Sequence, residues 1–223
     1  MTISRRMAMA GALIAPVAAQ TATAQAKLKP TGQETLGPFF PVRAPRSHDT
    51  DLTHYPGKSG HALGQVIQIT GRVFDTSGRP LPQAALTVWQ ANAAGRYTNP
   101  VDNNPAPLDP NFLGVVSFAV AGDGSYRLRT VKPGAYPEPS GTLRTPHIHF
   151  DVTNVDYRLV TQMYFPGDPL FPFDPIFNSV TDEKARQRMV SQFDLENTIP
   201  DWALCFRFDI VLRGREATPQ DKH

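Results

Sequence analysis

Two histidines separated by one residue are the first sign of chemistry in this sequence. His147 and His149 lie in the stretch written RTPHIHF, which begins at Arg144. In a β-strand, residues two apart project to the same face, so both imidazoles would point the same way. Imidazole is a ligand for zinc, copper, iron and nickel. By itself the pair fits either a metal site or two buried, hydrogen-bonded histidines.

Two tyrosines are the next candidate ligands, because they occur where the chain direction becomes irregular. Tyr97 follows Gly95-Arg after a predicted strand, and Tyr136 lies in the loop that leads to the histidines. A phenol must lose its proton to bind a metal, and its ordinary pKa is about 10. A hard trivalent cation can supply that shift. Two phenolates, two imidazoles and a hydroxide would make a neutral, five-coordinate Fe(III) site.

The usual zinc arrangements are missing from the sequence. It contains no His-Glu-x-x-His motif and only one cysteine, Cys205, which lies in an apolar run. We interpret Cys205 as a buried hydrophobic residue. A zinc hydrolase built on His147 and His149 is an alternative, but it lacks an obvious carboxylate ligand or general base nearby.

Short β-strands are the elements that must position these residues. Twenty-two prolines and sixteen glycines leave few windows for a long helix. The predicted fold is all-β, a sandwich core of about seven to eight strands with long loops. One short helix is predicted near residues 181–193, where an N-cap and early acids occur without a helix breaker. The predicted strands are 65–74, 85–90, 115–120, 125–131, 147–152, 159–165 and 205–212.

The amino terminus has the order of an export signal. Arg5-Arg6 precede an uncharged, alanine-rich run from Met7 to Ala19, and Ala24-Gln-Ala26 offers a cleavage site. The run is shorter than the roughly 20 residues that a bilayer requires, and the arginine pair favours the twin-arginine route. We therefore expect residues 1–26 to be cleaved and the mature protein to be periplasmic or extracellular. The alternative is a basic, disordered tail.

Three regions follow this segment. Residues 27–64 are expected to form an arm that contributes to a pocket or to subunit contacts, 65–215 a catalytic β-sandwich domain, and 216–223 a flexible tail. Two of the 22 basic residues lie in 1–26, so the remaining 197 residues carry 20 basic and 20 acidic side chains. No basic patch indicates nucleic acid binding, and no later run is apolar enough to span a membrane.

The candidate ligands fall in three segments, written WQANAAGRY (89–97), KPGAYP (132–137) and RTPHIHF (144–150). These segments resemble the iron-binding segments of the intradiol ring-cleavage dioxygenases, and the similarity extends from about Thr35 to Gly214. The resemblance implies that Tyr97, Tyr136, His147 and His149 bind one non-haem Fe(III) per chain. It also implies that O2 cleaves a catechol-type ring between its two hydroxyls to give a cis,cis-muconate, without a nicotinamide or a flavin.

The same resemblance implies roles for residues around the iron. Arg144 matches an arginine beside the bound ring, where a fixed cation would stabilise developing negative charge; the alternative is a strand-end arginine paired with a surface acid. Tyr136 would leave the iron when substrate binds and accept a proton. Gln162 would lie close to the iron and the substrate. The candidate substrate-binding residues are Thr35, Gly37, Pro38 and Trp89.

The substrate and the assembly are less tightly specified by the sequence. Protocatechuate, giving 3-carboxy-cis,cis-muconate, is favoured, and catechol, hydroxyquinol or another substituted catechol are alternatives. Glu138 stands where the most similar family member has a tryptophan, and it would repel a substrate carboxylate if it faced the pocket. We expect a homo-oligomer, with a related partner chain as the alternative. A non-catalytic, exported β-sandwich binding module is the rival from another class, but it would not explain four ligands in order.

Overall fold

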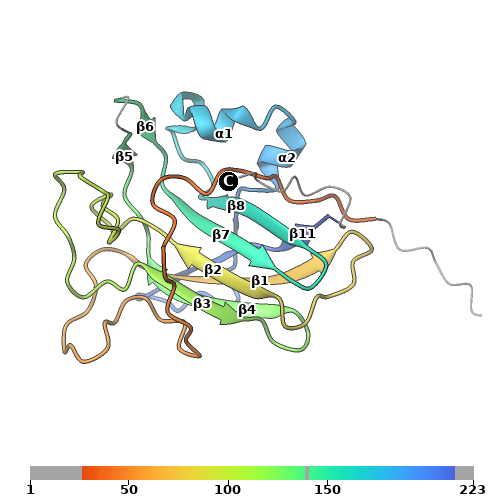
Figure 1. The fold of residues 1–223 in the computed structure, drawn as a ribbon, viewed down its shortest axis with the longest axis horizontal. Coiled ribbons are helices and arrows are strands. Elements are labelled where there is room, and N and C mark those ends of the chain that lie inside the picture. Colours follow the sequence, from red (N-terminus) through yellow and green to blue (C-terminus); the bar gives the residue numbers. More distant parts are fainter. Residues whose placement is uncertain (1–26, 139–140, 214–223) are drawn as a thin grey trace, which may run out of the picture.

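Residues 27–138 and 141–213 are described by a computed structural model in which two β-sheets face each other (Figure 1). In the first sheet, β1 is the central strand: it pairs antiparallel with β4 and parallel with both β10 and β11, while β9 pairs with β10. Its strands are β1 (Val66–Asp75), β4 (Ser125–Val131), β9 (Gln192–Phe193), β10 (Leu204–Arg207) and β11 (Ile210–Leu212).

The second sheet is antiparallel throughout and has the order β3-β2-β7-β8. A separate two-stranded ribbon of β5 and β6 precedes β7. The predicted all-β sandwich is therefore confirmed. The strands are β2 (Ala85–Trp89), β3 (Val115–Ala119), β5 (Tyr136–Pro137), β6 (Leu143–Arg144), β7 (His147–Thr153) and β8 (Arg158–Tyr164).

Strand β7 is buried on both faces, which explains its composition. Ile148, Phe150 and Val152 belong to the apolar core between the sheets. The alternate residues His147 and His149 point to the opposite face, as the period of two requires, yet they are buried as well. The amino-terminal arm covers that face: in Figure 1 it runs, red to orange, across β8 and β7.

The helical segment is shorter than predicted. Helix α2 (Glu183–Gln187) begins after the N-cap Asp182, whose side chain accepts a hydrogen bond from the Lys184 backbone N–H. Beyond it the chain becomes extended, because Met189 and Ser191 form backbone hydrogen bonds with Tyr164 of β8. These bonds bring Gln192–Phe193 into β9 instead of a helix. Helix α1 (Pro175–Ser179) and the 3₁₀ turn η1 (Phe171–Phe173) were not predicted.

The last predicted strand, 205–212, is divided into β10 and β11. The Phe208 backbone N–H donates to the Thr70 carbonyl between them, and the Phe208 carbonyl comes so close to Gly71 that a β-carbon there would collide with it. A glycine is therefore required on β1 where the two short strands meet. Cys205 is buried in β10, as expected.

The predicted export signal and carboxy-terminal tail lie outside the described residues. In the part of the chain that the structure covers, no helix has the length and apolar character needed to cross a bilayer.

Candidate metal centre and ring pocket

Four side chains from three parts of the fold converge on one point. The Nε2 atoms of His147 and His149 are 3.2 Å apart, and the hydroxyl oxygen of Tyr97 lies 3.3 Å from the first and 3.1 Å from the second. The hydroxyl oxygen of Tyr136 is 3.4 Å from His147 Nε2 and 3.5 Å from the Tyr97 oxygen. All four side chains are buried. The structure thus brings together every predicted ligand.

Local hydrogen bonds hold each of these residues in place. Strand β7 carries both histidines, and its pairing places His149 opposite Trp89 on one side and Gln162 on the other. Tyr97 lies in the loop after β2, where its backbone N–H donates to the Asp102 carboxylate. Tyr136 is held by β5, which is two residues long and places it opposite Arg144 of β6.

Burial controls the charge of the four groups. It raises the pKa of Tyr97, with Tyr136 nearby adding to the effect, and it raises the pKa of Tyr136 although Arg144 pulls the other way. It also lowers the pKa of His147 and His149, and the Arg144 charge lowers both further. In the protein alone, at neutral pH, the centre is therefore two neutral phenols and two neutral imidazoles.

The orientation of the imidazoles suits metal binding. Nδ1 of His147 lies 2.6 Å from the Thr145 carbonyl oxygen, so it carries the proton and leaves the Nε2 lone pair facing the centre. The His149 ring stacks on Trp89, with centroids 4.6 Å apart, and within the described residues its buried Nδ1 has no partner. With about 2 Å bonds to a metal, neighbouring donor atoms would lie about 2.8 to 3.5 Å apart. The observed spacings fall within that range.

The types of ligand atom at the centre indicate which metal ion it would bind. Among residues 27–138 and 141–213, no group of three or more His, Cys, Asp and Glu side chains is placed to hold a metal ion. The zinc hydrolase alternative therefore finds no third ligand of the usual kind in the described chain. Two phenols and two imidazoles fit a hard, trivalent ion such as Fe(III), whose charge favours the phenolate form.

Arg144 lies beside this centre within a buried polar network. Its Nε is 3.1 Å from both Asp174 carboxylate oxygens, its Nη2 is 2.7 Å from Gln162 Oε1, and its Nη1 is 3.5 Å from Glu138 Oε1. Burial lowers the pKa of Arg144, but Tyr136, Tyr164 and Asp174 together raise it, so the guanidinium stays charged. This contradicts the alternative of an arginine paired with a surface acid.

A cavity of about 310 Å³ opens next to the four ligands. It is large enough for a single aromatic ring, and the arm supplies much of its wall. Gly37 has φ +70°, and a β-carbon there would be 3.5 Å from His149 Cε1, so glycine lets the arm turn closely over the centre. The residues lining the cavity are Thr35, Leu36, Gly37, Pro38, Phe39, Tyr136, Arg144, His149 and Ile176.

Two predicted site residues lie beside this cavity instead of in its wall. Trp89 is stacked behind His149 and lines a separate hollow of about 250 Å³ with Phe39 and Tyr97. Gln162 contacts Arg144 and the Tyr164 hydroxyl from behind the pocket. The other candidate substrate-binding residues, Thr35, Gly37 and Pro38, line the cavity.

Sequence reasoning missed two acidic contributions to the site and left the orientation of a third, Glu138, undecided. Asp174 is the N-cap of α1, and its carboxylate also holds Arg144 and the Thr145 backbone N–H. Glu34 lies in the arm and reaches Tyr164. Glu138 faces Arg144, an orientation that the sequence left open. Only Glu138 had a signal in the sequence, because it stands where a similar family member has a tryptophan, two residues after Tyr136.

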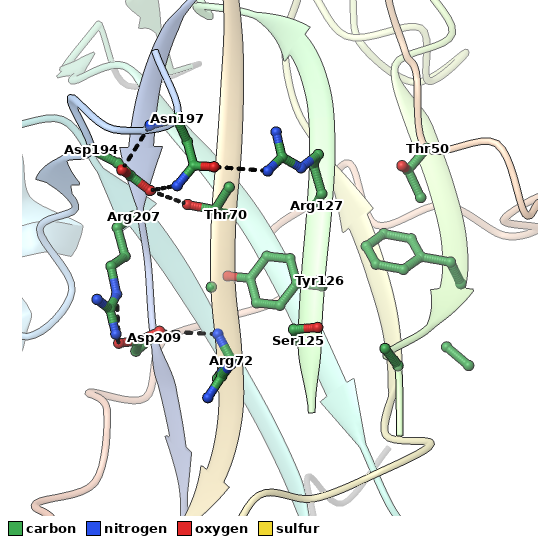
Figure 2. A pocket seen from close by; sticks show the side chains of 14 residues that line it. Thr50, Thr70, Arg72, Ser125, Tyr126, Arg127, Asp194, Asn197, Arg207 and Asp209 are labelled. Carbon is green, nitrogen blue, oxygen red and sulfur yellow. Dashed lines mark hydrogen bonds and ion pairs between the residues drawn. The ribbon is translucent and has the colours of Figure 1, made fainter. Parts of the chain in front are cut away.

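A larger hollow, of about 780 Å³, lies along β1 and β4 and extends to the end of β3 (Figure 2). Its charged side chains already have partners: Arg207 pairs with Asp209, and Asp194 accepts hydrogen bonds from Thr70 and Asn197. None of the four candidate ligands lines it. We therefore place the functional site at the convergent tyrosines and histidines.

Comparison with known proteins agrees with this placement. The family model described as "Dioxygenase" matches residues 35–214. The chain therefore belongs to the intradiol ring-cleavage dioxygenase family, and it is a dioxygenase of that class.

Individual members of the family are similar to this chain over a large part of its length. The chain is 50% identical over 196 residues to the protocatechuate 3,4-dioxygenase beta chain of Burkholderia cepacia, a match that covers 86% of this chain and 79% of the relative. It is 34% identical over 166 residues to hydroxyquinol 1,2-dioxygenase of a Rhizobium species, covering 67% of this chain and 53% of that one. The solved dioxygenase domain of a fusion protein from Streptomyces sp. SirexAA-E superposes with a TM-score of 0.62 at 27% identity, covering 83% and 99%.

Proposed function

We propose that this protein is an Fe(III)-dependent enzyme that cleaves a catechol-type ring between its two hydroxyl-bearing carbons. In the reaction, that carbon–carbon bond breaks and both atoms of O2 enter the product, a cis,cis-muconate. The observation that carries the proposal is the convergence of two tyrosine oxygens and two histidine nitrogens within 3.1 to 3.5 Å beside a ring-sized cavity. Family membership supports the same chemistry.

Tyr97, Tyr136, His147 and His149 would hold the iron. A ferric ion held there would supply a Lewis acid that draws electron density from the catechol ring. Because both phenols have a raised pKa in the protein alone, the ion must offset the cost of ionising them in a buried site. We infer one iron per chain, because the described residues form one such centre.

Tyr136 differs from Tyr97 in its position. Tyr136 lines the cavity, whereas Tyr97 lies behind it against Phe39, with ring centroids 4.6 Å apart. The oxygen of Tyr136 is therefore the one that can take a proton from an entering substrate hydroxyl. Tyr97 would stay in place and keep the centre assembled.

Arg144 is the one cation in the described wall of the cavity. Asp174 and Gln162 fix its guanidinium from behind, so it does not need to reorganise when charge develops on the ring. A fixed, buried cation of this kind stabilises negative charge on a reacting carbon far better than water does. We assign it that catalytic role.

Two candidate substrates differ in the substituent on the catechol ring. The 50% identical relative supports protocatechuate, which carries a carboxylate. A specific observation favours an uncharged catechol as a second candidate, because Glu138 places a carboxylate oxygen 3.5 Å from Nη1 of Arg144, which lines the cavity. A substrate carboxylate near Arg144 would meet this negative charge.

Oxygen uptake on a panel of catechols tests the function. We expect uptake with an iron-loaded preparation and a muconate product, and we expect catechol, protocatechuate and hydroxyquinol to differ in rate. Absence of uptake on every catechol, by a preparation that contains iron, would overturn the proposal.

Assembly and location complete the proposal. The relative's name, a beta chain, supports an assembly of several chains, either copies of this chain or this chain with a related partner. The order of charge, apolar run and cleavage site in residues 1–26 supports export through the twin-arginine route. Amino-terminal sequencing of protein recovered outside the cytoplasm would test it, and an intact Met1 there would contradict it.

A further inference from the structure

A buried carboxyl group in the arm is linked to the pocket arginine through two side chains. Glu34 is 9% exposed, and its carboxyl oxygens lie 2.8 and 3.0 Å from the Tyr164 hydroxyl. That hydroxyl lies 3.1 Å from Gln162 Oε1, which in turn lies 2.7 Å from Arg144 Nη2. The four residues form one continuous chain of hydrogen bonds, and the function derived above uses neither Glu34 nor Tyr164.

The donors and acceptors in this chain determine its protonation. Arg144 can only donate, so Gln162 must present its oxygen to it, and the Gln162 amide nitrogen then faces the Thr35 carbonyl at 3.5 Å. Tyr164 has one hydroxyl hydrogen, which can go to Gln162 Oε1 or to Glu34 but not to both. Both contacts are hydrogen bonds at once only when the Glu34 carboxyl group carries a proton and donates it to the Tyr164 oxygen, whereas an ionised Glu34 would take the Tyr164 hydrogen for itself. An ionised Glu34 would leave one short oxygen–oxygen contact without a hydrogen.

The surroundings of Glu34 agree with a neutral carboxyl group. Burial raises its pKa to about 8, while the Tyr164 hydrogen bond and the Arg144 charge lower it and the Asp174 charge raises it. These groups come from β8, from β6 and from the N-cap of α1. At neutral pH the hydrogen-bond chain is therefore complete.

Glu34 also fixes the wall of the pocket. Its backbone N–H donates to the Val160 carbonyl, and the Thr161 hydroxyl donates to the Gly32 carbonyl, so the arm follows β8. The next five residues, 35–39, line the cavity. A change at Glu34 would therefore affect the position of both Arg144 and the arm residues that line the cavity.

We propose that Glu34 is a positioning residue of this dioxygenase. By donating a hydrogen bond to Tyr164, it holds the side chains of Gln162 and Arg144 in position beside the pocket, and it anchors the arm. The inference rests on the proposed function. Above the pH at which Glu34 loses its proton, the Tyr164 hydrogen turns to the Glu34 carboxylate, Gln162 loses its hydrogen bond from Tyr164, and Arg144 keeps only Asp174 as a firmly held partner. Catalysis should then decline although the four metal ligands are intact.

The first test compares pH profiles of kcat/KM for iron-loaded wild type and Glu34→Gln, each normalised to its own maximum. The glutamine amide donates to Tyr164 at every pH. We expect the wild type to lose activity above pH about 8, and we expect the fall to move at least about one pH unit higher in Glu34→Gln. Superimposable profiles, or a wild type without that alkaline fall, would overturn the inference.

A matched control and a second variant separate positioning from folding. Asp151 is 8% exposed, pairs with Arg158 and lies toward the other end of β7, so Asp151→Asn should keep the wild-type profile. Tyr164→Phe keeps the ring that packs on Phe177 but removes the hydroxyl. We expect kcat to fall about 10- to 100-fold, with KM and the visible phenolate-to-Fe(III) absorption band of the iron-loaded enzyme unchanged. An unchanged kcat would overturn the inference.

These outcomes also distinguish the two proposals. A wild type that contains iron but cleaves no catechol refutes the proposed function. A wild type that is active, with Glu34→Gln superimposable on it, refutes only the role of Glu34.

Discussion

The protonation of Glu34 makes a prediction about folding that needs neither iron nor substrate. An unfolded glutamate ionises near its ordinary pKa of 4.5, whereas in the folded protein burial keeps the carboxyl group protonated until about pH 8. Between these values the folded state binds more protons than the unfolded state, so the free energy of unfolding falls as the pH rises. This contribution to stability is fully present below pH 4.5 and is lost as the pH rises through 8.

The magnitude follows from the two pKa values. A difference of about 3.5 in pKa corresponds to up to about 5 kcal/mol, at about 1.36 kcal/mol for each pKa unit. Glu34→Gln cannot ionise, so it lacks this slope. The stability of the variant relative to wild type should therefore rise by up to about 5 kcal/mol between pH 4.5 and 8, and level off above that. Every other titrating group is common to both proteins and cancels in the difference.

Urea denaturation of the iron-free proteins at a series of pH values measures the difference. Fluorescence of the buried Trp89 can report unfolding. Asp151→Asn is the control for removal of an equally buried carboxyl group, and its difference from wild type should not follow the course calculated for Glu34. A difference between Glu34→Gln and wild type that stays constant from pH 4.5 to 9 would refute the protonated Glu34.

Three further predictions concern the metal and the ring. Tyr97→Phe and Tyr136→Phe should each shift or abolish the visible phenolate-to-Fe(III) band, and a band unchanged in both would contradict the ligand assignment. Arg144→Lys keeps a positive charge but loses the planar guanidinium with its fixed N–H donors, so kcat should fall about 100-fold or more with iron content unchanged. An unaltered kcat would contradict a catalytic role for Arg144. Glu138→Gln should raise kcat/KM for protocatechuate relative to catechol by about tenfold or more, since a substrate carboxylate near Arg144 would be repelled by the Glu138 carboxylate. An unchanged ratio would show that Glu138 does not affect binding of the ring substituent.

The strands were predictable because their hydrophobic patterns are local. The period of two also placed His147 and His149 on one face without any structure. What the sequence did not reveal is that this second face of β7 is buried by the arm, because that contact joins residues 130 positions apart in the chain, as between Glu34 and Tyr164.

The parts of the fold that the sequence did not predict each have a physical cause. The β5–β6 ribbon has two residues in each strand, which is too short to show a periodic pattern, although it positions Tyr136 and Arg144. The segment after Gln187 has a helical composition, but its hydrogen bonds to Tyr164 outweigh that preference. Tyr97 and Tyr136 were candidate ligands because they lie in irregular segments, but family resemblance was needed to support that assignment, since a local pattern does not distinguish a ligand phenol from a core phenol.

Analysis of the product formed under ¹⁸O2 tests the central claim most directly. Iron-loaded wild type should convert catechol to cis,cis-muconate that carries two labelled oxygen atoms, one in each new carboxyl group. A semialdehyde formed by cleavage beside the hydroxyls, or a product with no label, would contradict the account.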